Sequence, residues 1–208
     1  MTEQRSPEWF ADRLGKVTAS RIKDVIAKTK TGYSTSRKNY AVELALERIT
    51  GQRNEGFSNA AIQRGNDLEP LARAAYEAMT GELVEECGLI LHPSIEMTGA
   101  SPDGLIGTDG LIEIKCPNSA THLEVMASGK ADPQYLPQMA WQMACTGRQW
   151  CDFASYDDRF PADLQLFVVR VPRNEKYIGE IEAEVKSFLL EVDEIVQKII
   201  MLREKKAA

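Results

Sequence analysis

Apolar residues run from 111 to 116 and are interrupted by Glu113 and Lys115. If this segment is extended, alternate side chains share a face, so Glu113 and Lys115 point the same way. Ile112 and Ile114 then point into a core on the opposite face. The pattern predicts a strand over 111–115 that presents an acid and a base side by side on one surface.

Apolar residues elsewhere recur at helical spacing. Thr18 or Ser20 is placed to cap the first predicted helix. Gly51 and Gly81 follow the second and third, as is typical of helix ends. We expect Pro70 to break or restart the third helix. The predicted helices span 18–28, 35–50, 59–80, 120–128, 135–145 and 175–206, the last of them long and amphipathic.

Short apolar segments bounded by turn residues predict strands in the middle of the chain. Two of the turns are Pro102-Asp103-Gly104 and Asp109-Gly110. Helices around such strands predict an α/β or α+β fold with a central mixed sheet. No linker-like segment divides the sequence, so we expect a single domain over 1–208. The predicted strands span 83–91, 97–100, 111–115, 150–155 and 164–171.

The composition is that of an ordinary globular protein, with 43% hydrophobic and 27% charged residues in 208 positions. No apolar run approaches the roughly 20 residues that span a bilayer. The first ten residues lack the apolar segment of a signal peptide. We therefore expect a cytoplasmic protein that does not bind membranes.

Charge is unevenly distributed along the chain, whose net charge is −6. Eight basic residues and one acid lie between 13 and 38, whereas 180–194 holds six acids and one lysine. A local basic region on an acidic protein suits a polyanion bound at one place. Taken alone, these clusters are also compatible with solvated helix faces.

Four cysteines are scattered over the sequence, and none forms a Cys-x-x-Cys pair. Neither histidine has another cysteine or histidine near it at the spacing of metal ligands, which argues against structural zinc. The thiols are better explained as reduced, buried side chains. Any metal would be a hard cation on carboxylates, such as Mg²⁺ or Mn²⁺.

Asp103 precedes Glu113 by ten residues, and a hairpin between them would bring the two carboxylates together. Two neighbouring carboxylates repel each other unless a cation lies between them. Lys115 shares the face of Glu113, where it could orient or deprotonate a water and stabilise negative charge. Cleavage of a phosphodiester needs a bound cation, an activated water and a positive group near the phosphate, and this cluster of residues could supply all three. The alternative is a surface Glu-Lys pair and an acid that merely closes a turn.

The spacing of Pro102-Asp103 and Glu113-Ile114-Lys115 resembles the PD-(D/E)xK nuclease superfamily. Within it, the chain is similar to the lambda-type phage alkaline exonucleases, also described as YqaJ-like viral recombinase nucleases. The similarity covers nearly the whole chain and implies a restriction-endonuclease-like core. The supporting segments are RLGKVTASRI (13–22), RGNDLEPLAR (64–73), SPDGL (101–105), LIEIKCP (111–117), YLPQMAWQM (135–143) and NEKYI (174–178).

The resemblance also implies roles for individual residues. It identifies metal ligands, a catalytic lysine and glutamine, a pocket for the 5′-phosphate of a DNA end, and side chains that touch or wedge apart the terminal base pairs. Taken alone, Arg13 and Ser20 are better explained as a surface arginine and a helix cap, and Glu69 equally well as an acid on a helix face. Gln138 would by default be an exposed helix residue, and Trp9 and Ile62 core or partly buried residues. The metal ligands are Asp103, Glu113, Glu69 and the Ile114 carbonyl; the catalytic pair is Lys115 and Gln138; the phosphate pocket is Arg13, Ser20 and Ser101; the end contacts are Trp9 and Ile62.

By resemblance, the expected activity is Mg²⁺-dependent 5′→3′ digestion of linear duplex DNA, with Mn²⁺ as a substitute. Mononucleotides would be released and 3′ single-stranded tails left for recombination. A homotrimeric ring and a phage single-strand annealing protein as partner are further implications. The alternatives are an endonuclease or iron–sulfur nuclease of the same superfamily and a non-catalytic DNA-binding module. Scattered cysteines argue against the iron–sulfur enzyme.

Overall fold

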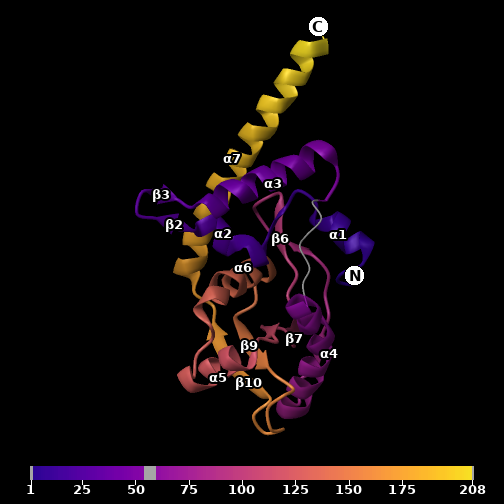
Figure 1. Ribbon diagram of the computed structural model, residues 1–208, viewed down its shortest axis with the longest axis vertical. Helices are drawn as coiled ribbons and strands as arrows, with labels where there is room; N and C mark the ends of the chain where they lie inside the picture. Colours follow the sequence, from indigo (N-terminus) through magenta and orange to yellow (C-terminus); the bar gives the residue numbers. More distant parts are fainter. Residues whose placement is uncertain (1, 54–59, 208) are drawn as a thin grey trace.

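The computed structural model describes residues 2–53 and 60–207 (Figure 1). Asn59, the expected start of the third helix, lies outside the described residues. The helices are α1 (Pro7–Arg13), η1 (Ala19–Arg21), α2 (Ile22–Ile26), α3 (Thr35–Thr50), α4 (Ala60–Thr80), α5 (Ser119–Ser128), η2 (Pro133–Tyr135), α6 (Leu136–Thr146) and α7 (Glu175–Ala207). The strands are β1 (Val17–Thr18), β2 (Lys28–Thr29), β3 (Gly32–Tyr33), β4 (Val84–Glu85), β5 (Ile90–Leu91), β6 (Thr98–Ala100), β7 (Gly104–Ile106), β8 (Gly110–Lys115), β9 (Trp150–Tyr156) and β10 (Leu166–Pro172).

The main sheet has five strands in the order β10-β9-β8-β7-β4. Strands β8 and β9 are parallel, and the other neighbours are antiparallel. A smaller sheet, β1-β6-β5, joins a parallel and an antiparallel pair, and β2 and β3 form a separate hairpin. The predicted mixed sheet flanked by helices is confirmed.

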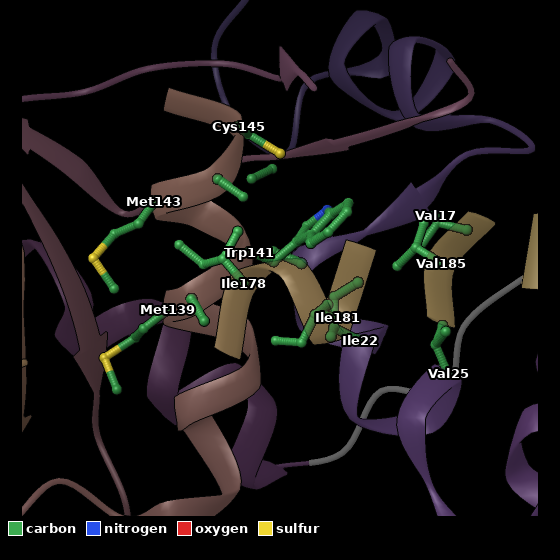
Figure 2. Packing of buried hydrophobic residues seen from close by; sticks show 14 of the residues in the cluster. Val17, Ile22, Val25, Met139, Trp141, Met143, Cys145, Ile178, Ile181 and Val185 are labelled. Carbon is green, nitrogen blue, oxygen red and sulfur yellow. The ribbon is translucent and has the colours of Figure 1, made fainter. Parts of the chain in front are cut away.

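Apolar residues cover both faces of the main sheet. On one face, Leu111 and Phe153 belong to a large core built with α2, α3, α6 and α7. Figure 2 shows Trp141 of α6 in this core, with residues of α2 and α7 around it. On the other face, Ile112 and Ile114 pack under α4 beside Tyr76. Strand β8 is therefore an interior strand.

The burial of β8 corrects one prediction. Glu113 and Lys115 do share a face, but Glu113 is fully buried there beneath residues of α6, whereas Lys115 stays partly exposed. The alternation of residues 111–116 predicts one face in the core and the acid and base side by side on a surface. A strand covered on both faces can carry the same pattern when its polar residues meet polar partners from a helix.

The predicted helix 35–50 is confirmed, with Ser34 as its cap and Gly51 in the left-handed conformation after it. The prediction for 18–28 is wrong in part. Neither Thr18 nor Ser20 caps a helix with its side chain, and α2 begins at Ile22 after a short 3₁₀ turn. Thr18 belongs instead to β1, where it pairs with Gly99 of β6.

Helix α4 runs without a break through Pro70, contrary to the prediction. A proline removes one intrahelical hydrogen bond, here the one that would reach the carbonyl of Asn66. Pro70 is exposed, whereas Leu68 and Tyr76 on the opposite side are buried against the sheet. Packing along the buried side keeps the helix continuous.

The predicted strand 83–91 divides between the two sheets, because β4 pairs with β7 and β5 pairs with β6. Strand β7 begins at Gly104, within the segment interpreted as a turn. A Cβ on Gly104 would lie 2.1 Å from Val84 Cγ1, so glycine permits the approach of β4 to β7.

The C-terminal half of α7 extends beyond the rest of the chain (Figure 1). Its exposed apolar residues there are Ile199, Ile200, Met201 and Leu202. Within the described residues, no helix is both long and apolar enough to traverse a lipid bilayer.

Candidate active site

Asp103 and Glu113 come together through the β7–β8 hairpin. Gly104 pairs with Ile112 in this antiparallel ladder, so the same register places Asp103 opposite Glu113. The Asp103 carboxylate accepts a hydrogen bond of 2.7 Å from the backbone N–H of Ile114. The acid of the Pro-Asp turn is thus attached to the strand that carries the second acid.

Three donors surround the buried carboxylate of Glu113. Lys115 Nζ and Gln138 Nε2 each lie 2.5 Å from its Oε1 atom. Gln142 Nε2 lies 2.5 Å from Oε2 and comes from the next turn of α6. Both oxygens are therefore satisfied, as a buried carboxylate requires.

The two acids and the lysine are electrostatically coupled. Burial and the neighbouring charge of Glu113 raise the pKa of Asp103 well above its usual range. Burial alone would lower the pKa of Lys115, but the carboxylates of Glu113 and Asp103 outweigh it and raise that pKa. Two adjacent carboxylates that share a single ammonium group favour the binding of a further cation.

Glu69 of α4 supplies a third carboxylate. Arg5 forms an ion pair with its Oε2 atom, and Arg73 lies 3.1 Å from Oε1. Arg64, also in α4, pairs instead with Asp157 and lies 3.0 Å from it. Glu69 is within range to contribute to the raised pKa of Asp103.

Two adjoining cavities bring the sequence-predicted residues together. The first, about 440 Å³, is lined by Glu69, Asp103, Ile114, Lys115 and Ile62. The second, about 160 Å³, is lined by Trp9, Arg13, Ser20, Ser101, Asp103 and Gln138. Asp103 and Arg5 line both cavities, and Glu113 lies behind the wall that Lys115 and Gln138 form.

The smaller cavity has a preorganised cationic wall. Ser101 Oγ accepts hydrogen bonds from Trp9 Nε1 at 3.0 Å and from Arg13 Nη1 at 3.2 Å. The Arg13 guanidinium also stacks on the Trp9 ring, 4.0 Å from its centroid. Burial lowers the pKa of Arg13 to about 10, so the side chain keeps its charge at neutral pH. Such a wall suits a phosphate.

A third cavity of about 310 Å³ continues from the second, with which it shares Trp9, Arg13 and Ser20. This third cavity is also lined by further basic residues of the segment 13–38 and by Arg53. Tyr40, Glu43 and Glu47 line it as well. The basic segment thus contributes to a continuous cavity system.

The donor chemistry of the larger cavity fits a hard divalent cation. Glu69 and Asp103 line it, Glu113 lies directly behind it, and all three offer carboxylate oxygens. Among the described residues, no group of three acidic, cysteine or histidine side chains is already arranged to hold a metal. Arg5, Lys115 and Gln138 occupy oxygens of these acids, so a cation would have to replace some of those contacts.

Sequence reasoning missed three residues of the site: Arg5, Tyr135 and Gln142. Gln142 follows Gln138 by one helical turn, and this i,i+4 pair in α6 was a usable signal. Tyr135 lines the larger cavity, and its ring centroid lies 4.8 Å from Lys115 Nζ. Arg5 reaches Glu69 over 64 positions, a contact that no local pattern indicates.

Two solved structures are similar to the chain over nearly its full length. Both are of an alkaline exonuclease, LHK-Exo, which is described as from Laribacter hongkongensis, and one is a complex with dAMP. The identity is 54%, with 98% of this chain and 100% of the other covered, at TM-scores of 0.89 and 0.90. No curated protein matches the chain.

A third structure shares the fold alone. It is a phage-related exonuclease from Haemophilus somnus 129PT, 16% identical, with 88% of this chain and 96% of the other covered and a TM-score of 0.72. Residues 8–149 of the present chain match the YqaJ-like viral recombinase domain. This range contains every candidate site residue named from the sequence. The chain therefore belongs to the YqaJ-like viral recombinase family.

Proposed function

We propose that this deoxyribonuclease is a Mg²⁺-dependent exonuclease that degrades one strand of linear duplex DNA from its 5′ end. It releases 5′-mononucleotides and leaves 3′ single-stranded tails for recombination. Family membership and 54% identity to an alkaline exonuclease support the nuclease activity. The finer statements depend on the arrangement of the two cavities.

The proposal rests on one observation: Asp103 lines both the larger cavity, which holds the acids and is called the acidic cavity below, and the smaller one, which Arg13 lines and which is called the cationic cavity. A phosphate held by Arg13, Ser20 and Ser101 would lie next to the group of acids. In DNA, the phosphodiester after a terminal 5′-phosphate is one nucleotide away. The geometry therefore suits cleavage of the first linkage from a 5′-phosphorylated end.

Asp103, Glu113 and Glu69, with the Ile114 carbonyl, are the proposed holders of one or two Mg²⁺ ions. Bound Mg²⁺ would supply Lewis-acid polarisation of the phosphodiester and a more acidic water. Lys115 orients the attacking water and stabilises negative charge that develops on the phosphate. Gln138 and Lys115 fix the orientation of the Glu113 carboxylate through their contacts with Oε1.

Arg13 binds the terminal phosphate through its guanidinium, which Ser101 and Trp9 hold in place. Ser20 adds a hydroxyl donor on the same wall. Trp9 and Ile62 border the two cavities, where they would contact or separate the terminal base pairs. The similar enzyme in complex with dAMP supports a nucleoside monophosphate as product.

The wider context is proposed by family resemblance. It consists of a homotrimeric ring around the DNA, a phage single-strand annealing protein as partner, and a location in the host cytoplasm. The projecting half of α7, with exposed Ile199 and Leu202, offers apolar surface that subunit contacts would cover.

The activity is tested by incubating matched linear and covalently closed circular duplexes with the protein and Mg²⁺, with EDTA as the control. An exonuclease digests the linear DNA and leaves the circle intact. Cleavage of the circle would indicate an endonuclease. Binding without cleavage of either form, with every divalent cation tested, would indicate a non-catalytic module.

A further inference from the structure

The segment before α1 is attached beside the proposed active site. Gln4 Nε2 donates to the carbonyls of Cys87 at 2.9 Å and Pro102 at 2.7 Å, and Pro102 directly precedes Asp103. A Cβ on Gly88 would lie 2.7 Å from the Thr2 carbonyl oxygen, so the chain passes closely there. These contacts fix the backbone on the N-terminal side of Arg5.

Arg5 itself has a strained backbone. Its φ of 68° lies in the left-handed region, which residues other than glycine adopt rarely. On its C-terminal side, Ser6 caps α1 by accepting a hydrogen bond of 3.1 Å from the Trp9 N–H. The conformation is thus held from both sides, and strain of this kind is common where a side chain serves function.

The guanidinium of Arg5 lies at the junction of the two cavities. Arg5 lines the acidic and the cationic cavity, a property that it shares with Asp103. Its side chain is 44% exposed and pairs with Oε2 of Glu69. Arg73 holds the other oxygen of Glu69 but lines neither cavity. Arg5 is therefore the cation on Glu69 that faces the space available to a substrate.

We propose that Arg5 binds the backbone phosphate next to the terminal 5′-phosphate. The proposal rests on the function proposed above. A cation held by Glu69 would neutralise that carboxylate and leave the Arg5 guanidinium available to another anion. A phosphodiester that lies between Arg13 and the acids would be this other anion. A guanidinium can donate two parallel hydrogen bonds to the oxygens of one phosphate.

The proposal separates the tasks of two arginines. Arg13 binds a group found on phosphorylated ends alone, so its loss should affect phosphorylated and hydroxyl ends differently. Arg5 binds a phosphate that every DNA strand carries. Loss of Arg5 should therefore weaken binding of both kinds of end by the same factor.

The test measures binding of short labelled duplexes by fluorescence anisotropy in Ca²⁺, which is used in place of Mg²⁺ to limit turnover. The variants are Arg5→Gln, Arg5→Lys and, as a matched loss of charge on the surface, Lys176→Gln, whose side chain is 88% exposed. Arg73→Gln tests whether weaker DNA binding results simply from the loss of a cation that pairs with Glu69. Thermal unfolding of each variant checks the fold.

Arg5→Gln is expected to bind both phosphorylated and hydroxyl duplexes about tenfold more weakly, the loss of one charge-assisted contact. The slope of log affinity against log salt should become shallower by about one. Arg5→Lys should recover most of the affinity, and Lys176→Gln should match the parent protein.

Three results would overturn the proposal: unchanged affinity in Arg5→Gln, a loss confined to phosphorylated ends, or an equal loss in Arg73→Gln. Digestion of linear duplex in Mg²⁺ by the parent protein is measured in parallel. Its absence would refute the proposed function, whereas the binding data still decide the role of Arg5.

Discussion

The ammonium of Lys115 lies 2.5 Å from Oε1 of Glu113, and Glu113 is fully buried. Lys115 thereby connects an acid inside the protein to the cavity that Asp103 and Glu69 line. An ion pair in this position neutralises a buried charge and also presents a cation where a phosphodiester would bind.

Replacing Lys115 with alanine should reduce digestion of linear duplex on the order of 10²–10³-fold, as loss of a charge-stabilising donor does. Binding of DNA in Ca²⁺ should remain largely intact, because the cationic pocket is unchanged. Initial rates of acid-soluble nucleotide release measure the first effect and anisotropy the second. Near-normal digestion would refute the role of Lys115.

Gln142 was missed by sequence reasoning, and its contribution can be measured separately. Gln142→Leu removes the donor to Oε2 of buried Glu113. The unpartnered oxygen should lower the free energy of unfolding by about 1–3 kcal/mol. Gln134→Leu is the control, since the exposed Gln134 amide contacts the partly exposed acid Asp132 and its loss should change stability by less than about 0.5 kcal/mol. Urea unfolding compares them, and equal effects would contradict the burial argument.

Arg13→Ala should remove most of the preference for phosphorylated 5′ ends. The variant loses a charge-assisted contact, so the phosphorylated substrate should be used about tenfold less well while the hydroxyl substrate changes little. Competition between the two substrates in one reaction gives the ratio directly. If the parent protein already degrades both ends alike, the pocket assignment is wrong.

The environment of Asp157 predicts that part of the protein's stability is lost at acidic pH. Burial raises its pKa, but hydrogen bonds from Arg159 and Ser119 outweigh burial and lower the pKa below its unfolded value. A depressed folded-state pKa stabilises the protein above the unfolded pKa, about 3.9, and this contribution is lost as the pH falls toward the folded value. Asp157→Asn should therefore be less stable at pH 7, with a difference that narrows below about pH 4.

Urea unfolding of the parent protein and Asp157→Asn at pH 7, 4 and 3 measures that difference. Comparison of two proteins that differ by one carboxyl separates Asp157 from the other acids that titrate in the same range. A difference that stays constant, or one that widens on acidification, would contradict the assignment.

Local patterns in the sequence predicted most helices and the strand that carries Glu113, because caps, glycines and alternation act over a few residues. They did not predict that 83–91 would divide between two sheets, since that depends on pairing with distant β7 and β6. Pro70 was misjudged for the same reason: packing of α4 on the sheet outweighs the loss of one hydrogen bond.

In the candidate site, too, local patterns predicted the residues that are close in sequence but not the long-range contacts. Asp103, Glu113 and Lys115 lie close in sequence, and a hairpin sufficed to bring them together. The placement of Arg13 and Ser101 on one wall was suggested by family resemblance, because 88 positions separate them. Arg5 and Gln142 were identified from the structure alone. The ion pair of Arg5 with Glu69 is long-range and leaves no local pattern. The buried amide of Gln142 is signalled only by its spacing from Gln138.

The proposed 5′→3′ digestion is tested most directly by following both ends of one linear, 5′-phosphorylated duplex. The DNA is labelled at the 5′ terminus or at the 3′ terminus and is incubated with the protein and Mg²⁺, and products are separated on a denaturing gel. A 5′→3′ exonuclease should release the 5′ label first, as a mononucleotide, while the 3′ label stays in a long single strand. Early release of the 3′ label, or intact termini with every divalent cation tested, would contradict the proposal.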